Sequence, residues 1–215
     1  MNAGNIIFDL DGTLWDSSAA VAESWSQTIR ASCNPLLKNS IPDADRIKTV
    51  MGLTMDEIGS RLFPQLSETQ RFDLLENCMR EENNYLAGAG GTLLENEEQV
   101  LSRLREKHRL FIVSNCQSGY IEAFFEFTGF ERYFSDYLCW GDTRASKDVT
   151  IKQLIEKNSC INSVYVGDTV MDMKAAADAG IPFVFAAYGL GRLEPSSKPD
   201  EIAGSFEDLL RIFEC

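Results

Sequence analysis

The chain has few of the residues on which several common kinds of enzyme chemistry depend. It contains one histidine, His108, which lies between two basic residues where a predicted helix ends, so we expect a surface or capping residue. Because the chain has no second histidine, no other part of it can form a Ser-His-Asp or Cys-His catalytic site. The six cysteines include no C-x-x-C pair, which argues against a zinc site and a disulfide framework and indicates free thiols in a reducing compartment.

Long apolar runs and an excess of positive charge are also missing. No apolar run approaches the roughly 18 residues of a membrane span, and the first residues lack the pattern of a signal peptide. The chain has 33 acidic and 20 basic residues, and its net charge of -13 argues against binding to nucleic acid or an anionic membrane. We therefore expect a cytoplasmic protein whose partner is a small molecule, and the oligomeric state stays open.

The rest of the chain is organised around a short apolar run, residues 6–8, that ends in two carboxylates. Asp9 and Asp11 follow this run directly, and Gly12 comes next, as expected where a buried strand opens into a site. If residues 9–11 stay extended, both carboxylates point the same way, because strand side chains alternate with a period of two. Two carboxylates aimed at one point repel each other, so the remaining chain is expected to supply a cation.

Two regions with different patterns follow this first strand, which we predict at residues 5–10. Residues 15–86 read as all-helical, and a glycine-rich stretch at 88–91 reads as a hinge. Beyond it, helices alternate with short apolar strands, which predicts an α/β fold with a Rossmann-like parallel sheet. We therefore expect an α/β core of residues 1–14 and 88–215 around an inserted all-helical domain of residues 15–87. The predicted helices span 17–33, 43–51, 54–62, 67–83, 95–107, 120–127, 148–157, 171–179 and 206–213, and the later strands span 110–113, 137–139, 164–166 and 183–185.

Polar groups follow four of the five predicted strands. Because ligands of open parallel sheets bind beyond the carboxyl ends of the strands, these groups should gather at one rim. Carboxylates without a histidine or cysteine partner favour a hard cation such as Mg²⁺. A hydroxyl, an amide and a lysine would form a cradle for a small oxyanion, and a carboxylate nucleophile suits phosphoryl transfer. The groups at the predicted rim are Asp9, Asp11, Ser114, Asn115, Lys147, Asp168 and Asp172.

In order and spacing, these groups resemble the four motifs of the haloacid dehalogenase-like (HAD) hydrolase superfamily over the whole chain. The helical insertion resembles the C1 cap of that superfamily, and residues 9–17 and 167–180 look most like its phosphoglycolate phosphatase-like branch. One position departs from the pattern, since Asp148 follows Lys147 where many relatives have proline. The resemblance implies a cap that closes over the rim and sets specificity.

The resemblance also implies a role for each residue of the rim. Asp9 would be the nucleophile and a metal ligand, and Asp11 would be the general acid/base and offer its backbone carbonyl to the metal. Ser114 and Lys147 would bind the phosphoryl group with Asn115 nearby, Asp168 would bind Mg²⁺, and Asp172 would bind it directly or through water.

The second carboxylate separates the possible activities. A halide leaves without a proton, whereas an alkoxide leaving from phosphate needs one, so Asp11 favours a phosphatase or mutase over a dehalogenase. We expect a Mg²⁺-dependent phosphatase acting on a small phosphate monoester, similar to phosphoglycolate or a sugar phosphate. The alternatives are a sugar-phosphate mutase similar to β-phosphoglucomutase and a non-catalytic protein that binds a phosphate ligand. Trp15, beside the first motif, is expected to be a packing residue, with substrate contact as the alternative.

Overall fold

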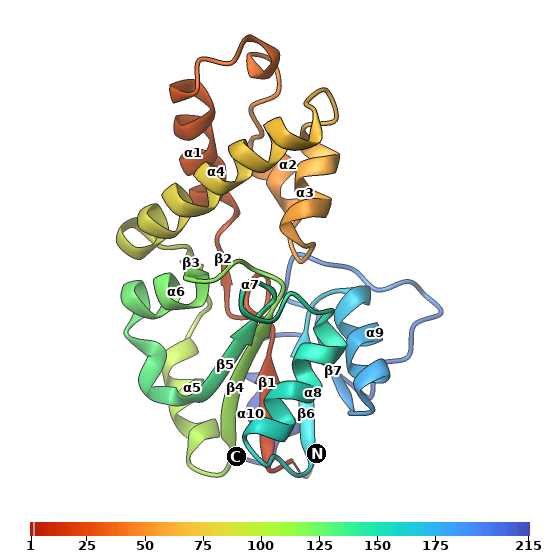
Figure 1. Cartoon of the computed structure of the whole chain (residues 1–215). Helices are drawn as coiled ribbons and strands as arrows, with labels where there is room; N and C mark the ends of the chain where they lie inside the picture. Colours follow the sequence, from red (N-terminus) through yellow and green to blue (C-terminus); the bar gives the residue numbers. More distant parts are fainter. Residues whose placement is uncertain (2) are drawn as a thin grey trace. The chain divides into compact units, whose positions relative to one another are not determined.

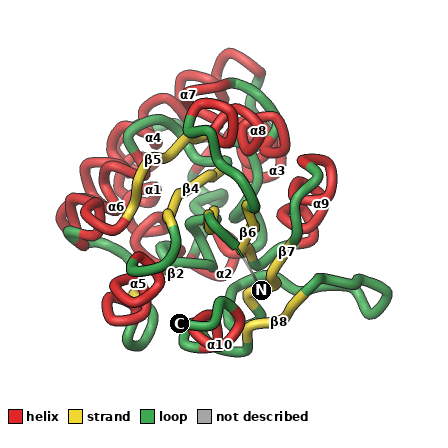
Figure 2. The backbone as a smooth tube through the Cα atoms, turned by 90° about the horizontal axis from the view of Figure 1, so that it is seen from below, coloured by secondary structure: helices red, strands yellow, loops and turns green. Residues whose placement is uncertain are grey.

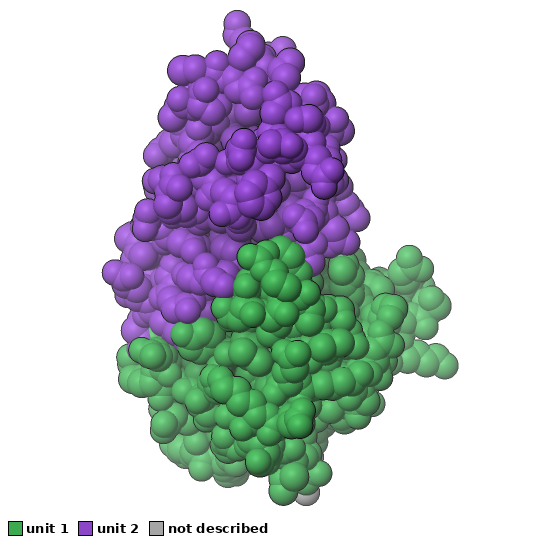
Figure 3. Space-filling view, viewed as in Figure 1, with its two compact units in different colours: residues 1–16, 92–115, 130–215 green, residues 17–91, 116–129 purple. Residues whose placement is uncertain are grey.

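A computed structural model of the chain describes Met1 and residues 3–215, and these form two compact units (Figures 1 and 3). The first unit, green in Figure 3, comprises Met1–Asp16, Thr92–Asn115 and Phe130–Cys215. The second, purple, comprises Ser17–Gly91 and Cys116–Gly129. The boundaries expected from the sequence, with an insertion of residues 15–87, stay a prediction.

The first unit contains a six-stranded parallel sheet, so the predicted α/β fold is confirmed. Its strand order is β5-β4-β1-β6-β7-β8, which places β1 between β4 and β6. All four residues of β1 are buried, as expected for a strand that is covered on both faces. The strands are β1 (Asn5–Phe8), β4 (Arg109–Ser114), β5 (Phe134–Cys139), β6 (Ser163–Gly167), β7 (Phe183–Ala186) and β8 (Glu201–Ala203).

Helices cover both faces of this sheet (Figure 2). On one face, α8 (Lys147–Lys157) and α9 (Val170–Ala179) pack on Ile7 and its neighbours in the core. On the other face lie α5 (Glu97–Arg105) and α10 (Asp208–Ile212), where the Phe8 ring centroid is 6.2 Å from that of Phe206. Successive side chains of β1 point to opposite faces of the sheet, so the strand packs against both layers of helices. The unit also contains α7 (Trp140–Thr143), a 3-10 turn at Phe130–Tyr133, and the antiparallel pair β2 (Trp15–Asp16) and β3 (Thr92–Leu93).

The second unit is helical. Its helices are α1 (Ser18–Ala31), α2 (Ala44–Lys48), α3 (Met55–Leu62), α4 (Glu68–Ala89) and α6 (Tyr120–Thr128), with a 3-10 turn at Pro35–Leu37. A capping box of Thr54 and Glu57 begins α3, and a second one, with Ser67 and Gln70, begins α4. No helix in the described part of the chain is long and apolar enough to cross a membrane.

One expectation about where an element ends is wrong, and the expected hinge is only partly helical. The first strand ends at Phe8 and not at Leu10, because the carbonyl of Leu10 accepts hydrogen bonds from three later amides and turns the chain. α4 continues through Gly88 and Ala89, so the first half of the glycine-rich stretch is helical, and a hinge at residues 88–91 stays a prediction. Gly90 ends α4 with a φ of 64°, a left-handed value that glycine adopts without strain.

Candidate active site

Three buried aspartates meet at the carboxyl ends of two central strands. Asp9 follows β1, Asp168 follows β6, and Asp172 lies in the first turn of α9. One oxygen from each lies within 4.8 Å of the others, and all three side chains are buried. Ligand oxygens at about 2.1 Å from one Mg²⁺ ion would lie no farther apart than this.

Lys147 places a positive charge against these carboxylates. Its Nζ lies 2.9 Å from Asp9 Oδ1 and 2.6 Å from Asp172 Oδ1, and its side chain is almost fully buried. The lysine is the first residue of α8, after Ser146 as the N-cap. Asp148, where the sequence departs from the expected family pattern, accepts a hydrogen bond from Ser146 Oγ at 2.5 Å. An aspartate in the first turn suits the helix dipole, so this departure is compatible with the helix that positions Lys147.

The cluster contains more negative than positive charge. Burial, followed by the charge of Asp172, raises the pKa of Asp9 well above its ordinary range. The same two causes raise the pKa of Asp168 to about 7. Burial lowers the pKa of Lys147, but Asp172 and Asp9 outweigh it, and the net shift is upward. All three shifts have the direction that excess buried negative charge produces.

The donor set fits a hard cation. Asp168 Oδ2 accepts hydrogen bonds from the amides of Leu190 and Gly191, each at 2.8 Å. Its Oδ1 is buried and has no hydrogen-bond partner among the described residues. An orphaned carboxylate oxygen beside two further carboxylates, with no nitrogen or sulfur donor in the group, is the environment that Mg²⁺ prefers.

The predicted cradle residues lie at the same end of the sheet. Ser114 is the last residue of β4, the strand beside β1, and Asn115 follows it; both side chains are buried. Phe8 pairs with Ile112, so the register brings Ser114 level with the chain just beyond Asp9. The β4 strand thus delivers a hydroxyl and an amide to the rim where the carboxylates lie.

Asp11 has a different environment from Asp9. Its carboxylate is half-buried, and its Oδ1 accepts a hydrogen bond from Trp15 Nε1 at 3.0 Å. The condition that residues 9–11 stay extended is not met, because the chain turns at Leu10. Asp9 faces Lys147 whereas Asp11 faces Trp15, so the two carboxylates are not equivalent.

Residues 6–186 match the protein family described as haloacid dehalogenase-like hydrolase. The chain belongs to this family. A curated relative, the phosphoglycolate phosphatase of Vibrio parahaemolyticus, is 30% identical over 96% of this chain and 94% of its own length. The family resemblance drawn from the four motifs is therefore confirmed, and the chain is a hydrolase of the HAD type.

Solved structures agree on the HAD fold. A predicted phosphoglycolate phosphatase from Haemophilus somnus superposes with a TM-score of 0.82, at 24% identity over 99% of this chain and 98% of its own. A haloacid dehalogenase-like family protein from Streptococcus pneumoniae also gives 0.82, at 22% identity over 98% of each chain. The likeness extends over nearly the whole chain and includes the helical residues as well as the sheet.

The loop after β7 is a part of the candidate site that sequence reasoning missed. A Cβ on Gly191 would come within 2.1 Å of the Asp168 carbonyl oxygen, and one on Gly189 within 2.4 Å of Asp168 Cβ. These close approaches allow the amides of Leu190 and Gly191 to reach the carboxylate. The available signal was the G-x-G sequence of residues 189–191 shortly after the strand at 183–186.

His108 lies at the other end of the sheet. It directly precedes β4, whereas Ser114 ends that strand, and its Nδ1 lies 2.7 Å from the carbonyl oxygen of Ala3. The single histidine therefore has no place in the hydrolase site.

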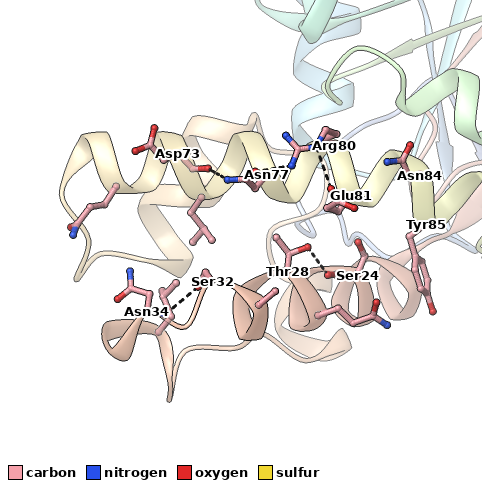
Figure 4. A pocket seen from close by; sticks show the side chains of 15 residues that line it. Ser24, Thr28, Ser32, Asn34, Asp73, Asn77, Arg80, Glu81, Asn84 and Tyr85 are labelled. Atoms are coloured by element: carbon pink, nitrogen blue, oxygen red, sulfur yellow. Dashed lines mark hydrogen bonds and ion pairs between the residues drawn. The ribbon is translucent and has the colours of Figure 1, made fainter.

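A cavity of about 850 Å³ lies within the helical unit, between α1 and α4 (Figure 4). Its walls carry hydroxyl and amide side chains such as Thr28 and Asn77. Arg80 also lines it, but its guanidinium is already bonded to Asn77 and Glu81. None of the candidate site residues lines this cavity. We therefore place the candidate active site at the carboxylate cluster, where buried charges converge, and not in this cavity.

Proposed function

We propose that the chain is a Mg²⁺-dependent phosphatase that hydrolyses a small phosphate monoester through an aspartyl phosphate. The observation that carries this proposal is the buried contact of Asp9 with Lys147 beside Asp168 and Asp172. A lysine can hold a phosphoryl oxygen next to a carboxylate nucleophile. Family membership over residues 6–186 and the curated phosphoglycolate phosphatases among its relatives support the same reaction.

In the first proposed step, an Asp9 carboxylate oxygen attacks phosphorus, and the bond between phosphorus and the leaving oxygen breaks. Asp11 donates its carboxyl proton to that oxygen. In the second step, water attacks phosphorus, Asp11 takes the water proton, and Asp9 and inorganic phosphate are released. Ser114, Asn115 and Lys147 would bind the phosphoryl oxygens throughout.

Mg²⁺ would be held by the carboxylates of Asp9 and Asp168, the backbone carbonyl of Asp11, and Asp172 directly or through water. When bound, it would neutralise charge on the carboxylates and the phosphoryl oxygens. Asp172 has less capacity than Asp168 to bind the ion directly, because both oxygens of Asp172 already accept hydrogen bonds, from Lys147 and Thr169.

For the substrate, we propose a small phosphorylated metabolite similar to phosphoglycolate or a sugar phosphate. Support comes from the phosphoglycolate phosphatase of Vibrio parahaemolyticus, which is similar over 96% of the chain. The mutase alternative is not favoured by the relatives that bear a phosphatase name. We also propose a cytoplasmic setting, supported by the six cysteines, which are all free thiols. The role of the helical residues as a cap stays a prediction of the family pattern.

The test is phosphate release by the wild-type protein and by Asp9→Asn. With Mg²⁺, the wild type should release inorganic phosphate from 2-phosphoglycolate or another member of a phosphomonoester panel, and a chelator should stop the reaction. Asp9→Asn should lose at least about 10³-fold in kcat with its fold retained, because the substitution removes the nucleophile at almost constant volume.

Asp178→Asn is the matched control, since Asp178 is an exposed carboxylate paired with Lys174 on the surface of α9. It should keep wild-type activity. Substantial hydrolysis by Asp9→Asn would contradict the mechanism, and isomer formation without phosphate release would identify a mutase.

A further inference from the structure

Trp15 is buried and directs a hydrogen-bond donor at Asp11. The Trp15 side chain is 1% exposed, and its Nε1–H donates to Asp11 Oδ1 at 3.0 Å. Asp11 itself is half-buried, unlike Asp9, which is 2% exposed and faces Lys147. The carboxylate that is proposed to move protons thus has an aromatic N–H partner from its own loop.

Main-chain hydrogen bonds fix the backbone of the residue that carries the indole. The amides of Leu14 and Trp15 both donate to the carbonyl of Leu10, at 2.8 and 3.4 Å, and the Gly12 amide donates to the Trp15 carbonyl at 2.8 Å. Trp15 also pairs with Leu93 in the two-stranded sheet of β2 and β3. The tryptophan is therefore held by main-chain bonds that do not involve Asp11.

A second residue supports the same loop. Tyr188, which lies beyond β7, donates its hydroxyl to the carbonyl of Thr13 at 3.1 Å. The loop of residues 10–15 is thus tied both to itself and to the chain beyond β7. Because its position is fixed, the indole N–H can select one orientation of the Asp11 side chain.

We propose that Trp15 is a positioning residue that holds the Asp11 carboxylate for proton transfer, an inference that rests on the proposed phosphatase function. The indole N–H is a donor only, and the carbonyl oxygen of a neutral carboxyl group accepts a hydrogen bond better than its hydroxyl oxygen does, so the N–H favours an unprotonated Oδ1. The transferable proton therefore belongs on Asp11 Oδ2. It passes from this atom to the leaving oxygen as the bond to phosphorus breaks, and Oδ2 receives the proton of the attacking water in the second step.

Leaving-group chemistry tests this role. An alkoxide leaving group needs the proton, whereas nitrophenolate leaves without one. Trp15→Phe removes the N–H and keeps an aromatic ring. We expect kcat for an alkyl phosphate, 2-phosphoglycolate or glycerol phosphate, to fall about 10- to 100-fold with little change in KM. The single-turnover burst of nitrophenol from p-nitrophenyl phosphate should change less than about threefold.

Trp25→Phe is the matched control. Trp25 is also 1% exposed and also donates its indole N–H to a buried carboxylate, that of Glu82, but within the helical unit. The control should leave the ratio of alkyl to aryl rates unchanged. In an Asp11→Asn background, Trp15→Phe should add no further loss, because the group that it positions is already disabled.

The contact can also be measured in the folded wild-type protein. The indole ¹H–¹⁵N resonance of Trp15 should shift upfield in Asp11→Ala, because the hydrogen bond to a carboxylate is lost. An unchanged resonance, or equal losses by Trp15→Phe on alkyl and aryl substrates, would overturn the positioning role. Absence of Mg²⁺-dependent phosphate release by the wild type on every substrate would instead overturn the proposed function.

Discussion

At the scale of single residues, Glu97 is a buried carboxylate outside the site. It is 2% exposed, its Oε2 accepts a hydrogen bond from the Leu94 amide at 3.2 Å, and its Oε1 has no partner among the described residues. Burial raises the pKa of Glu97 from 4.5 to about 8, although the Leu94 amide acts in the opposite direction. The folded protein therefore holds a proton that the unfolded chain releases between these two pH values.

This difference predicts a pH-dependent loss of stability. The folded state binds more protons than the unfolded state from pH 4.5 to about 8, so stability should fall as pH rises through this window and level off above it. Glu97→Gln stays neutral, so it should match the wild type near the lower limit and be more stable above the upper one, by about 2 to 4 kcal/mol.

Urea unfolding of both proteins at the two ends of the window checks this prediction. Glu95→Gln, at an exposed position two residues earlier, is the control and should show no such gain. Equal stability of Glu97→Gln and the wild type at alkaline pH would show that the carboxylate gains water or a partner in solution.

Single residues of the candidate site differ in how well the sequence predicts them. Asp9 and Asp168 could be found because carboxylates that directly follow apolar strands are a local signal. The contact between Trp15 and Asp11 could not, because it depends on the turn at Leu10, which no residue in the predicted strand indicates. The roles of the predicted site residues stay predictions until kinetics tests them.

At the scale of elements, two capping boxes offer a controlled comparison. Thr169 and Asp172 begin α9, and Ser67 and Gln70 begin α4, with the same reciprocal bonds. Thr169→Ala and Ser67→Ala should each lower stability by about 1 kcal/mol, because each helix loses an N-cap. Only Thr169→Ala should also reduce activity, since Thr169 Oγ1 donates to Asp172 Oδ2 at 2.6 Å in the carboxylate cluster.

Thermal unfolding measures the loss of stability in each variant. The Mg²⁺ dependence of kcat measures the loss of activity expected for Thr169→Ala. We expect a higher Mg²⁺ requirement for Thr169→Ala and an unchanged one for Ser67→Ala. An unchanged requirement in both variants would mean that Lys147 and the backbone amide of residue 169 suffice to orient Asp172.

The elements were predictable to different degrees. Core strands such as β4 and β6 were found to within one residue at each end, because their side chains are buried on both faces and form continuous apolar runs. The short β2, β3 and β8 were missed, since two or three residues cannot show a period. Their main-chain pairing, which the sequence does not encode locally, forms these strands. The helix predicted over residues 67–83 also stops short of the end of α4 at Ala89, because the last turn contains Gly88, a residue that disfavours helix in isolation.

At the scale of the whole molecule, bound Mg²⁺ should stabilise the fold. A ligand that binds only the folded state adds about 2.7 kcal/mol at 100 times its dissociation constant, so Tm should rise with Mg²⁺ concentration. The net charge of -13 also makes ordinary salt stabilising through relief of self-repulsion, so KCl at equal ionic strength is the reference.

Asp168→Asn is the informative variant in this titration. It removes a carboxylate whose Oδ1 has no partner among the described residues, so it should abolish the shift beyond that of KCl. The same Mg²⁺-specific shift in Asp168→Asn and the wild type would place the ion elsewhere in the molecule.

The position of β1 between β4 and β6 has a consequence for synthesis on the ribosome. β1 comes early in the chain, but both of its sheet neighbours are encoded much later. At about 5 to 20 residues per second, the roughly 100 residues up to β4 take some 5 to 20 s to translate. Throughout that interval the apolar Ile6, Ile7 and Phe8 of the nascent chain have no strand to pair with. The apolar run that leads to Asp9 thus needs shielding from aggregation while the chain up to β4 is translated.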